Sequence, residues 1–207
     1  MYVGASVNFD IPVLHYGAIL ADPPWSFKTW SVKGMGKNPD GIINFGKANA
    51  AERHYKTMDL EEIKKLPVGL LAAKDCVLFM WAIDPMIPQA LEVGAAWGFK
   101  YKTVGFYWAK TGVSDPNKFP IGTGHWTRAN PEQCLLFTRG HPKRVSAGVR
   151  KLIIAQRREH SRKPDEVHAG IEQLVSGPYL ELFARERRPG WDCWGNQTDK
   201  FNQEEAA

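Results

Sequence analysis

The tetrapeptide Asp22-Pro23-Pro24-Trp25 combines residue types that suit a flat base carrying an amino group. An ionised Asp offers hydrogen-bond acceptors and no donor, and Trp offers a face on which a base can stack. The two prolines lack backbone N–H groups and have a fixed φ, so their carbonyl groups are rigid further acceptors. Two acceptors that hold both N–H bonds of an exocyclic amine, such as adenine N6, favour the pyramidal geometry that frees its lone pair. The pattern therefore predicts a site that activates an amine by orientation and electrostatics.

An ordinary turn is the alternative, because Asp-Pro often begins one. The apolar run of residues 18–21 directly precedes Asp22 and predicts a buried strand. Since ligands of open α/β sheets bind outside the carboxyl ends of the strands, this position favours the functional interpretation.

Apolar runs that alternate with helix signals predict an α/β sheet with helices on both of its faces. Strands are expected at residues 18–21, 76–81, 102–108, 133–138 and 179–183. The continuous apolar run 76–81 is expected to be a central parallel strand. Helices are expected from Asp59, where Glu62 completes a capping box, over residues 86–97, and from residues 164–166. The long polar loop 26–54 is expected to be functional or mobile, and a second polar loop spans 111–130.

The composition of the 207-residue chain, with 43% hydrophobic and 12% aromatic residues, predicts a single globular domain over residues 1–207. No apolar run is long enough to span a membrane, and the first residues lack the pattern of a signal peptide, so a cytoplasmic protein is expected. The three widely spaced cysteines indicate reduced thiols. No metal site is expected, because the His and Cys residues lack the spacing of metal ligands.

Basic residues cluster between positions 143 and 188, and the formal net charge is +5. This charge is compatible with a polyanionic partner, and a solvated basic face is the alternative. Lys163 stands at a predicted helix N-terminus, where it meets either an anionic group or solvent. The segment 181–185 closes a strand with a charged pair that suits either a ribose or a structural ion pair. Asn196 and Gln197 follow a Gly turn and can bind polar ligands as donors and as acceptors.

Nine motifs in chain order resemble the DPPW-type N6-adenine methyltransferases that use S-adenosylmethionine. This family includes the catalytic subunit of the eukaryotic mRNA adenosine methyltransferase and many short bacterial and phage members. The motifs lie at residues 21–25, 55–58, 78–81, 108–110, 122–126, 132–135, 160–166, 181–185 and 195–197.

The resemblance implies a Rossmann-like methyltransferase sheet of seven strands, mostly parallel with one antiparallel strand, in a permuted motif order. It implies S-adenosyl-L-methionine as the cofactor and nucleic acid as the partner, with DNA favoured over RNA. By motif, the target adenine would be held by Asp22, Pro23, Pro24 and Trp25. The cofactor would be held by Asp10, Ile11, Asp22, Lys163, Arg185, Asn196 and Gln197. The base would be flanked or bound by Tyr55, His125, Trp126 and Glu132.

Two departures from the family pattern concern the cofactor. Asp10-Ile11 lies closer to the DPPW strand than the corresponding Asp-Ile of the family, and Glu186-Arg187-Arg188 replaces the His-Asn of the mRNA enzyme. An RNA methyltransferase and a non-catalytic nucleic-acid-binding subunit are the alternatives, and an oligomer or a partner subunit is compatible with the sequence. Inactive partners in this family have lost the tetrapeptide, which is intact here, so catalysis is favoured.

Overall fold

The computed structural model describes residues 9–26, 57–122, 126–159 and 162–201. In these ranges, a single sheet of seven strands has the order β5-β3-β4-β2-β1-β6-β7. The strands are β1 (Tyr16–Ala21), β2 (Ala72–Ala82), β3 (Lys100–Thr111), β4 (Glu132–Arg139), β5 (Leu152–Gln156), β6 (Tyr179–Leu182) and β7 (Trp191–Trp194). The helices are α1 (Leu60–Lys64), α2 (Ile87–Ala96) and α3 (Glu166–Leu174), with short 3-10 helices η3 (Val68–Leu70) and η4 (Asp84–Met86).

The sheet is mostly parallel. Strand β1 is parallel to both β2 and β6, and the pairs β3–β5 and β6–β7 are parallel as well. In the described sheet, β4 is the strand that runs against its neighbours, which are β2 and β3. These findings confirm the predicted sheet with one antiparallel strand. The strand expected to be central and parallel, β2, is central, but it is parallel to β1 alone.

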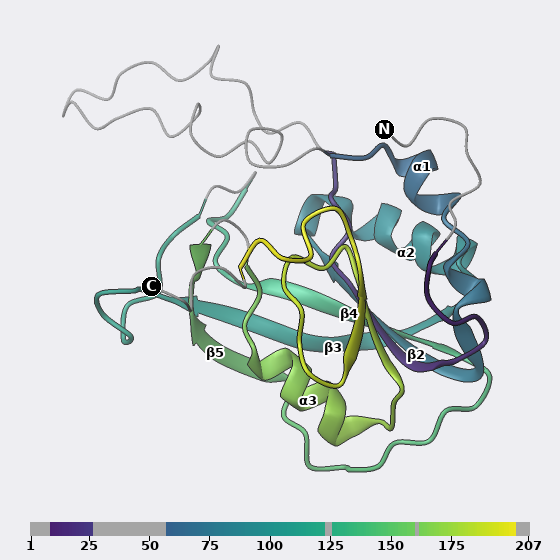
Figure 1. The fold of residues 1–207 in the computed structure, drawn as a ribbon. Coiled ribbons are helices and arrows are strands. Elements are labelled where there is room, and N and C mark those ends of the chain that lie inside the picture. Colours follow the sequence, from purple (N-terminus) through teal and green to yellow (C-terminus); the bar gives the residue numbers. More distant parts are fainter. Residues whose placement is uncertain (1–8, 27–56, 123–125, 160–161, 202–207) are drawn as a thin grey trace.

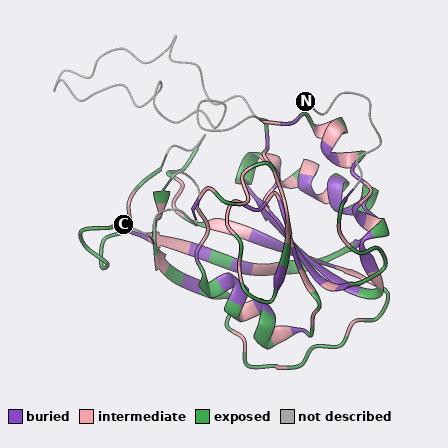
Figure 2. Ribbon diagram, viewed as in Figure 1, coloured by how far each residue is buried: buried purple, intermediate pink, exposed green. Residues whose placement is uncertain are grey.

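Helices cover both faces of the sheet, as predicted (Figure 1). On one face, Ile19 of β1 belongs to the same core cluster as Ile63 of α1 and Val93 of α2. On the other face, Leu20 shares a cluster with Val167 and Ile171 of α3. Neighbouring residues of β1 thus point to opposite cores, as the alternation of a strand requires. Figure 2 shows buried residues along the strands and on the helix surfaces that face them.

Two edge strands were not predicted. Strand β5 exposes Leu152 and Ile154, which are 56% and 59% accessible, so its burial pattern does not match that of a core strand. The charged residues Arg150 and Lys151 directly precede it, so the sequence there indicated a basic cluster and not a strand. Strand β7 has only four residues, too few for an alternation to be recognised.

The predicted capping box of α1 is present. Glu62 N–H donates to the Asp59 carboxylate at 2.8 Å, and the Glu62 carboxylate accepts from Asp59 N–H at 3.3 Å. Helix α3 begins differently, because Asp165 precedes it without capping it by a side-chain hydrogen bond. Its carboxylate instead binds Arg158 and Arg188.

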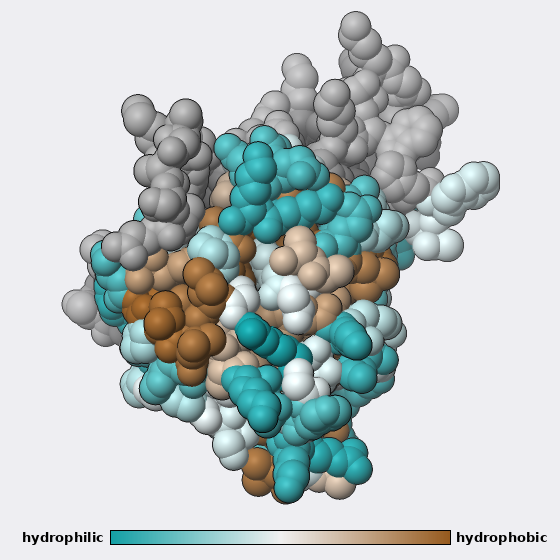
Figure 3. All heavy atoms as spheres, turned by 90° about the vertical axis from the view of Figure 1, so that its right-hand side faces the viewer, coloured by the Kyte–Doolittle hydropathy of each residue, from teal (hydrophilic) through white to brown (hydrophobic). Residues whose placement is uncertain are grey.

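The surface of one side of the molecule is mainly hydrophilic, with an apolar patch that gathers at one margin (Figure 3). In the described part of the chain, no helix combines the length and apolar character that crossing a bilayer requires. The three cysteines are free thiols, as expected, with Cys76 and Cys134 buried.

Candidate active site

Asp22 directly follows β1, at the carboxyl edge of the parallel strands. Strand β1 lies between β2 and β6. After β1 the chain first builds the sheet on the β2 side and later adds β6 and β7 on the other side, so the strand order reverses at β1. Such a reversal of strand order is where open α/β sheets bind ligands. The backbone N–H of Asp22 donates to Leu182 O at the end of β6, at 3.4 Å, and this contact ties the tetrapeptide to the crevice.

Three more charged side chains converge on Asp22. Lys163 Nζ lies 2.6 Å from Asp22 Oδ2 and 3.5 Å from Glu132 Oε2. The other carboxylate oxygen of Glu132 binds Lys110 Nζ. We call these four residues the charged cluster. Its members come from the ends of β1 and β3, the start of β4 and the segment before α3, so sheet topology brings them together.

The electrostatics of the charged cluster set its two carboxylates apart. Burial raises the pKa of Asp22, and the charges of Lys163 and Arg185 only partly oppose this effect. Burial also acts to raise the pKa of Glu132, but Lys163 and Lys110 outweigh it, and the pKa is lowered. Glu132 therefore stays ionised and holds two lysines. Asp22 is the carboxylate whose charge is less stabilised, which makes it the better acceptor for a further hydrogen-bond donor.

The two prolines also have partners inside the chain. Pro23 O accepts from Trp25 N–H at 2.8 Å, and Pro24 O accepts from Met58 N–H at 3.0 Å. These bonds brace the tetrapeptide against the segment that leads to α1. A carbonyl oxygen has a second lone pair, so each can still accept from a ligand.

Trp25 is not an open stacking face. Its side chain is 5% exposed, and Nε1–H donates to Trp81 O at 3.0 Å. Its backbone forms a bridge with Met58. This burial opposes the stacking role that the sequence led us to expect. The indole lies in the core, where its hydrogen bond to Trp81 O ties the tetrapeptide to β2.

Trp25→Ala is therefore expected to act on stability. The change opens a cavity and removes the hydrogen bond from Trp25 Nε1 to Trp81 O, and truncation of a buried aromatic typically costs about 3–5 kcal/mol. Urea unfolding of both proteins measures this loss, with Trp25→Phe as the smaller-volume control. A normal free energy of unfolding, combined with a raised KM for the substrate, would instead support stacking.

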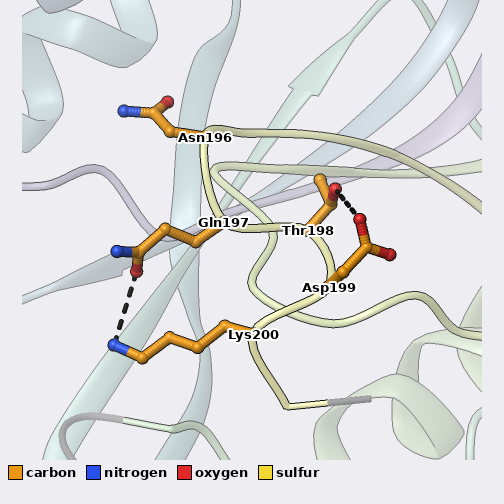
Figure 4. Close-up of a pocket in the computed structure, with 5 residues that line it drawn as sticks. All are labelled: Asn196, Gln197, Thr198, Asp199 and Lys200. Carbon is orange, nitrogen blue, oxygen red and sulfur yellow. Dashed lines mark hydrogen bonds between the residues drawn. The ribbon is translucent and has the colours of Figure 1, made fainter. Parts of the chain in front are cut away.

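Three of the candidate cofactor residues, Arg185, Asn196 and Gln197, follow the carboxyl ends of β6 and β7. Asn196 and Gln197 line an open hollow of about 440 Å³, together with Thr198, Asp199 and Lys200 (Figure 4). Gln197 Oε1 accepts from Lys200 Nζ at 3.5 Å, whereas Thr198 and Asp199 bond to one another on the other side of the turn.

The turn that carries Asn196 is pressed against the end of β6. A Cβ at Gly195 would lie 2.6 Å from Ala184 O, so glycine permits this close approach. Arg185, next along the chain, places its guanidinium 5.1 Å from the Phe201 ring centroid, and its charge lowers the pKa of Asp22. Arg185 thus lies close enough to Asp22 for its charge to act on the charged cluster.

Asp10 and Ile11 also reach this edge of the sheet. The preceding Phe9 packs edge-on against Trp194, the last residue of β7, with ring centroids 4.9 Å apart. Ile11 packs against the core, and Asp10 is exposed. The fold therefore brings the N-terminal pair close to the turn of Asn196, although Asp10 and Ile11 precede Asn196 by 186 and 185 positions in sequence.

Several basic residues of the clusters between positions 143 and 188 are paired with acids. Arg162 bonds to Glu186 at 2.5 Å, Arg188 bonds to Glu186 and Asp165, and Arg187 bonds to Asp199. The departure at residues 186–188 thus builds an ion-pair network with the segment before α3. Glu181 pairs with His168 at 2.9 Å, which favours the structural alternative for that carboxylate.

The structure describes two of the four residues expected to flank or bind the base, Trp126 and Glu132. Tyr55 and His125 lie outside the described residues. Trp126 is described and fully exposed. Glu132 lies in the site, but its oxygens hold Lys163 and Lys110. Lys110 was not predicted to have a role, although its motif, residues 108–110, was recognised.

No group of His, Cys, Asp and Glu side chains that could hold a metal ion occurs within residues 9–26, 57–122, 126–159 and 162–201.

Comparison with known proteins agrees with this geometry. Residues 16–197 match the MT-A70 family. The chain belongs to the MT-A70 family. It is therefore an S-adenosylmethionine-dependent methyltransferase.

Individual relatives of this MT-A70 protein differ in how much of their length it covers. It is 34% identical over 192 residues to the type II methyltransferase M.MunI of Mycoplasma sp. This alignment covers 90% of this chain and 79% of M.MunI. It is 28% identical over 195 residues to the human N(6)-adenosine-methyltransferase catalytic subunit METTL3, of which it covers 30%. The MT-A70-like N(6)-adenosine-methyltransferase of Arabidopsis thaliana is 31% identical over 186 residues, and 24% of it is covered. The chain thus spans less than a third of these two eukaryotic relatives.

Proposed function

We propose that this methyltransferase modifies N6 of adenine in DNA. Two differences among its relatives support DNA over RNA. Identity and coverage are both greater for the type II methyltransferase, at 34% and 79%, than for the human protein named for adenosine, at 28% and 30%. The adenine-N6 assignment rests on one observation, the intact tetrapeptide with Asp22 at the strand-order reversal and Lys163 beside it.

The proposed role of Asp22 is to accept a hydrogen bond from the exocyclic amine of adenine. The remaining lone pair of Pro23 O or Pro24 O supplies the second acceptor. Holding both N–H bonds orients the nitrogen lone pair and stabilises the positive charge that develops there. The buried bonds of Trp25 and Met58 keep these acceptors in fixed positions.

The side chains of the site fit S-adenosylmethionine, which supplies a methyl group on a positively charged sulfur. Asp22 and Lys163 form an opposite-charge pair that matches the ammonium and carboxylate groups of the methionine moiety. Asn196, Gln197 and Arg185 offer donors and acceptors for its ribose and base, and Asp10 and Ile11 lie at the same edge. Glu132 and Lys110 act by positioning Lys163.

RNA methylation is the second candidate, favoured by the matches to N(6)-adenosine-methyltransferases over 88–92% of this chain. A non-catalytic nucleic-acid-binding role is less compatible with the intact tetrapeptide, because the carboxylate of Asp22 lies within the charged cluster and is paired with Lys163. We further propose that residues 1–207 act as a single cytoplasmic domain, with or without a partner subunit.

The decisive experiment is incubation of the purified protein with radiolabelled S-adenosylmethionine and matched DNA and RNA oligonucleotides. We expect label in DNA, located at N6-methyladenine by nuclease digestion and mass spectrometry. Transfer to RNA alone would replace the DNA proposal by the RNA one. Failure to label either polymer, with cofactor binding intact, would favour the non-catalytic role.

A further inference from the structure

Phe201 lies where three basic side chains meet. Its ring is buried, with 5% of the residue exposed. The guanidinium carbon of Arg162 lies 4.8 Å from the ring centroid, that of Arg185 lies 5.1 Å away, and Lys200 Nζ lies 5.6 Å away. Cations are attracted to the electron-rich face of an aromatic ring, and the attraction is stronger where water is excluded. A buried ring can therefore hold together basic side chains that would otherwise repel one another.

Two of these basic residues connect the ring with the charged cluster. Arg162 directly precedes Lys163, whose ammonium group lies 2.6 Å from the carboxylate of Asp22. Arg185 follows β6, and its charge opposes the rise in the pKa of Asp22. The ring thus contacts both the segment before α3 and the segment after β6.

The third basic residue, Lys200, belongs to the turn that carries Asn196 and Gln197 (Figure 4). Lys200 N–H donates to Gln197 O at 3.0 Å, and its Nζ donates to Gln197 Oε1 at 3.5 Å. The next residue, Phe201, donates its backbone N–H to Arg185 O at 3.2 Å. The backbone of Phe201 therefore ties the turn to the segment after β6, while its ring reaches the segment before α3.

Arg162 is held by other contacts as well. Its Nη2 donates to Glu186 Oε2 at 2.5 Å, and its backbone N–H donates to Glu159 O at 2.8 Å. Its Nε is buried and has no hydrogen-bond acceptor among the residues that the structure describes. A buried N–H without an acceptor is costly, so the attraction to the Phe201 ring matters more for this guanidinium than it would at the surface.

We propose that Phe201 is a positioning residue for S-adenosylmethionine. Its ring holds Arg162 and thereby fixes the position of the neighbouring Lys163. Its contacts with Arg185 and with the turn of Asn196 keep the three parts of the cofactor site at the spacing that one cofactor molecule requires. The inference rests on the proposed function, because it uses the cofactor residues assigned there, and it adds a residue that acts through them.

Phe201→Leu tests this role, because leucine is apolar but has no aromatic face, and Phe201→Tyr is the conservative variant. Phe99→Leu is the matched control. Phe99 is also buried, and it precedes β3, which is parallel to β1, so it lies at the sheet edge opposite to Asp22. Isothermal titration without nucleic acid should show that Phe201→Leu raises the Kd for S-adenosylmethionine at least about tenfold. Phe201→Tyr and Phe99→Leu should stay within about twofold of wild type.

Enzyme kinetics on DNA separate positioning from a general loss of structure. Phe201→Leu should raise the KM for S-adenosylmethionine, whereas kcat at saturating cofactor and the KM for DNA should stay within about twofold of wild type. Arg162→Met should reproduce most of the loss of cofactor affinity. The double variant should bind the cofactor within about twofold of the weaker single variant, because both substitutions remove the same contact.

Three results would overturn the inference: unchanged cofactor affinity in Phe201→Leu, an equal loss of affinity in Phe99→Leu, or fully additive losses in the double variant. The titrations require no methyl transfer. Wild-type protein that binds S-adenosylmethionine but labels neither DNA nor RNA would therefore overturn the proposed function, while the titrations would still decide the role of Phe201. Wild-type protein that does not bind the cofactor would overturn both.

Discussion

Asp22→Asn is expected to abolish measurable methyl transfer while the protein stays folded. The substitution keeps the shape of the side chain but replaces an acceptor oxygen by an NH2 group. That donor would face the N–H bonds of the target amine instead of accepting from them. Removing one preorganised electrostatic contact of this kind costs about a hundred- to a thousandfold in kcat. The rate of label transfer to DNA measures the effect, and a variant within about tenfold of wild type would contradict the proposed role.

The pH dependence of the wild-type enzyme follows from the same carboxylate. Asp22 accepts from the amine in its ionised form, and burial raises its pKa above the usual value. The kcat/KM value should therefore fall on acidification at a higher pH than for an ordinary aspartate. An acid limb at the position of an exposed carboxyl group would indicate that another residue controls activity.

The thermal stability of Asp22→Asn is the control for its loss of activity, and the raised pKa of Asp22 determines the direction in which Tm changes. Because the pKa of Asp22 is raised on folding, the folded state binds the proton more tightly than the unfolded state. Its contribution to the free energy of unfolding is most favourable below the unfolded pKa and is lost as pH rises through the folded pKa. At neutral pH the ionised group therefore opposes folding. Asp22→Asn should show a Tm at pH 7 no lower than that of wild type, which separates lost chemistry from lost structure.

The parts of this protein that could be predicted from sequence are those with a local cause. The capping box of α1 depends on two residues three positions apart, and both hydrogen bonds are present. The core strands follow from apolar runs, and β2 and β4 extend the expected runs by only a few residues. The family resemblance supplied the antiparallel strand, which no local pattern predicts.

Other features depend on contacts between distant segments, which no local pattern shows. Trp25 is a large aromatic in a suggestive motif, but its exposure is decided by Trp81 and Met58. Glu132 was expected near the substrate base, yet its two lysine partners come from β3 and from the segment before α3. Arg162 and Arg188 likewise find acids that are remote in sequence, since Glu186 is 24 residues from Arg162 and Asp165 is 23 residues from Arg188. The number of these basic residues is known from the sequence, but the acids that pair with them are not.

Lys163 is the residue on which the two halves of the site depend. Its Nζ lies 2.6 Å from Asp22 and 3.5 Å from Glu132, and 5.4 Å from the ring centroid of Trp81. The ammonium group thus separates two carboxylates that would otherwise repel one another, and the charge of Glu132 already acts to raise the pKa of Asp22. On the proposed function, the same group also binds the carboxylate of the methionine moiety.

Lys163→Met is therefore expected to weaken S-adenosylmethionine binding by about a hundredfold, because it removes the partner of the methionine carboxylate, and losing one partner of a buried charge pair typically costs about 2–5 kcal/mol of binding free energy. It should also raise the pKa of Asp22 further and move the acid limb of kcat/KM to higher pH. Lys163→Arg keeps the charge and should recover most of the binding. Glu132→Gln leaves Lys163 bonded to Asp22, so its loss of affinity should be smaller and its acid limb should move to lower pH.

Isothermal titration with S-adenosylmethionine compares the three variants. Equal affinities for Lys163→Met and wild type would remove Lys163 from the cofactor site, whereas opposite movements of the two acid limbs would demonstrate its electrostatic control of Asp22.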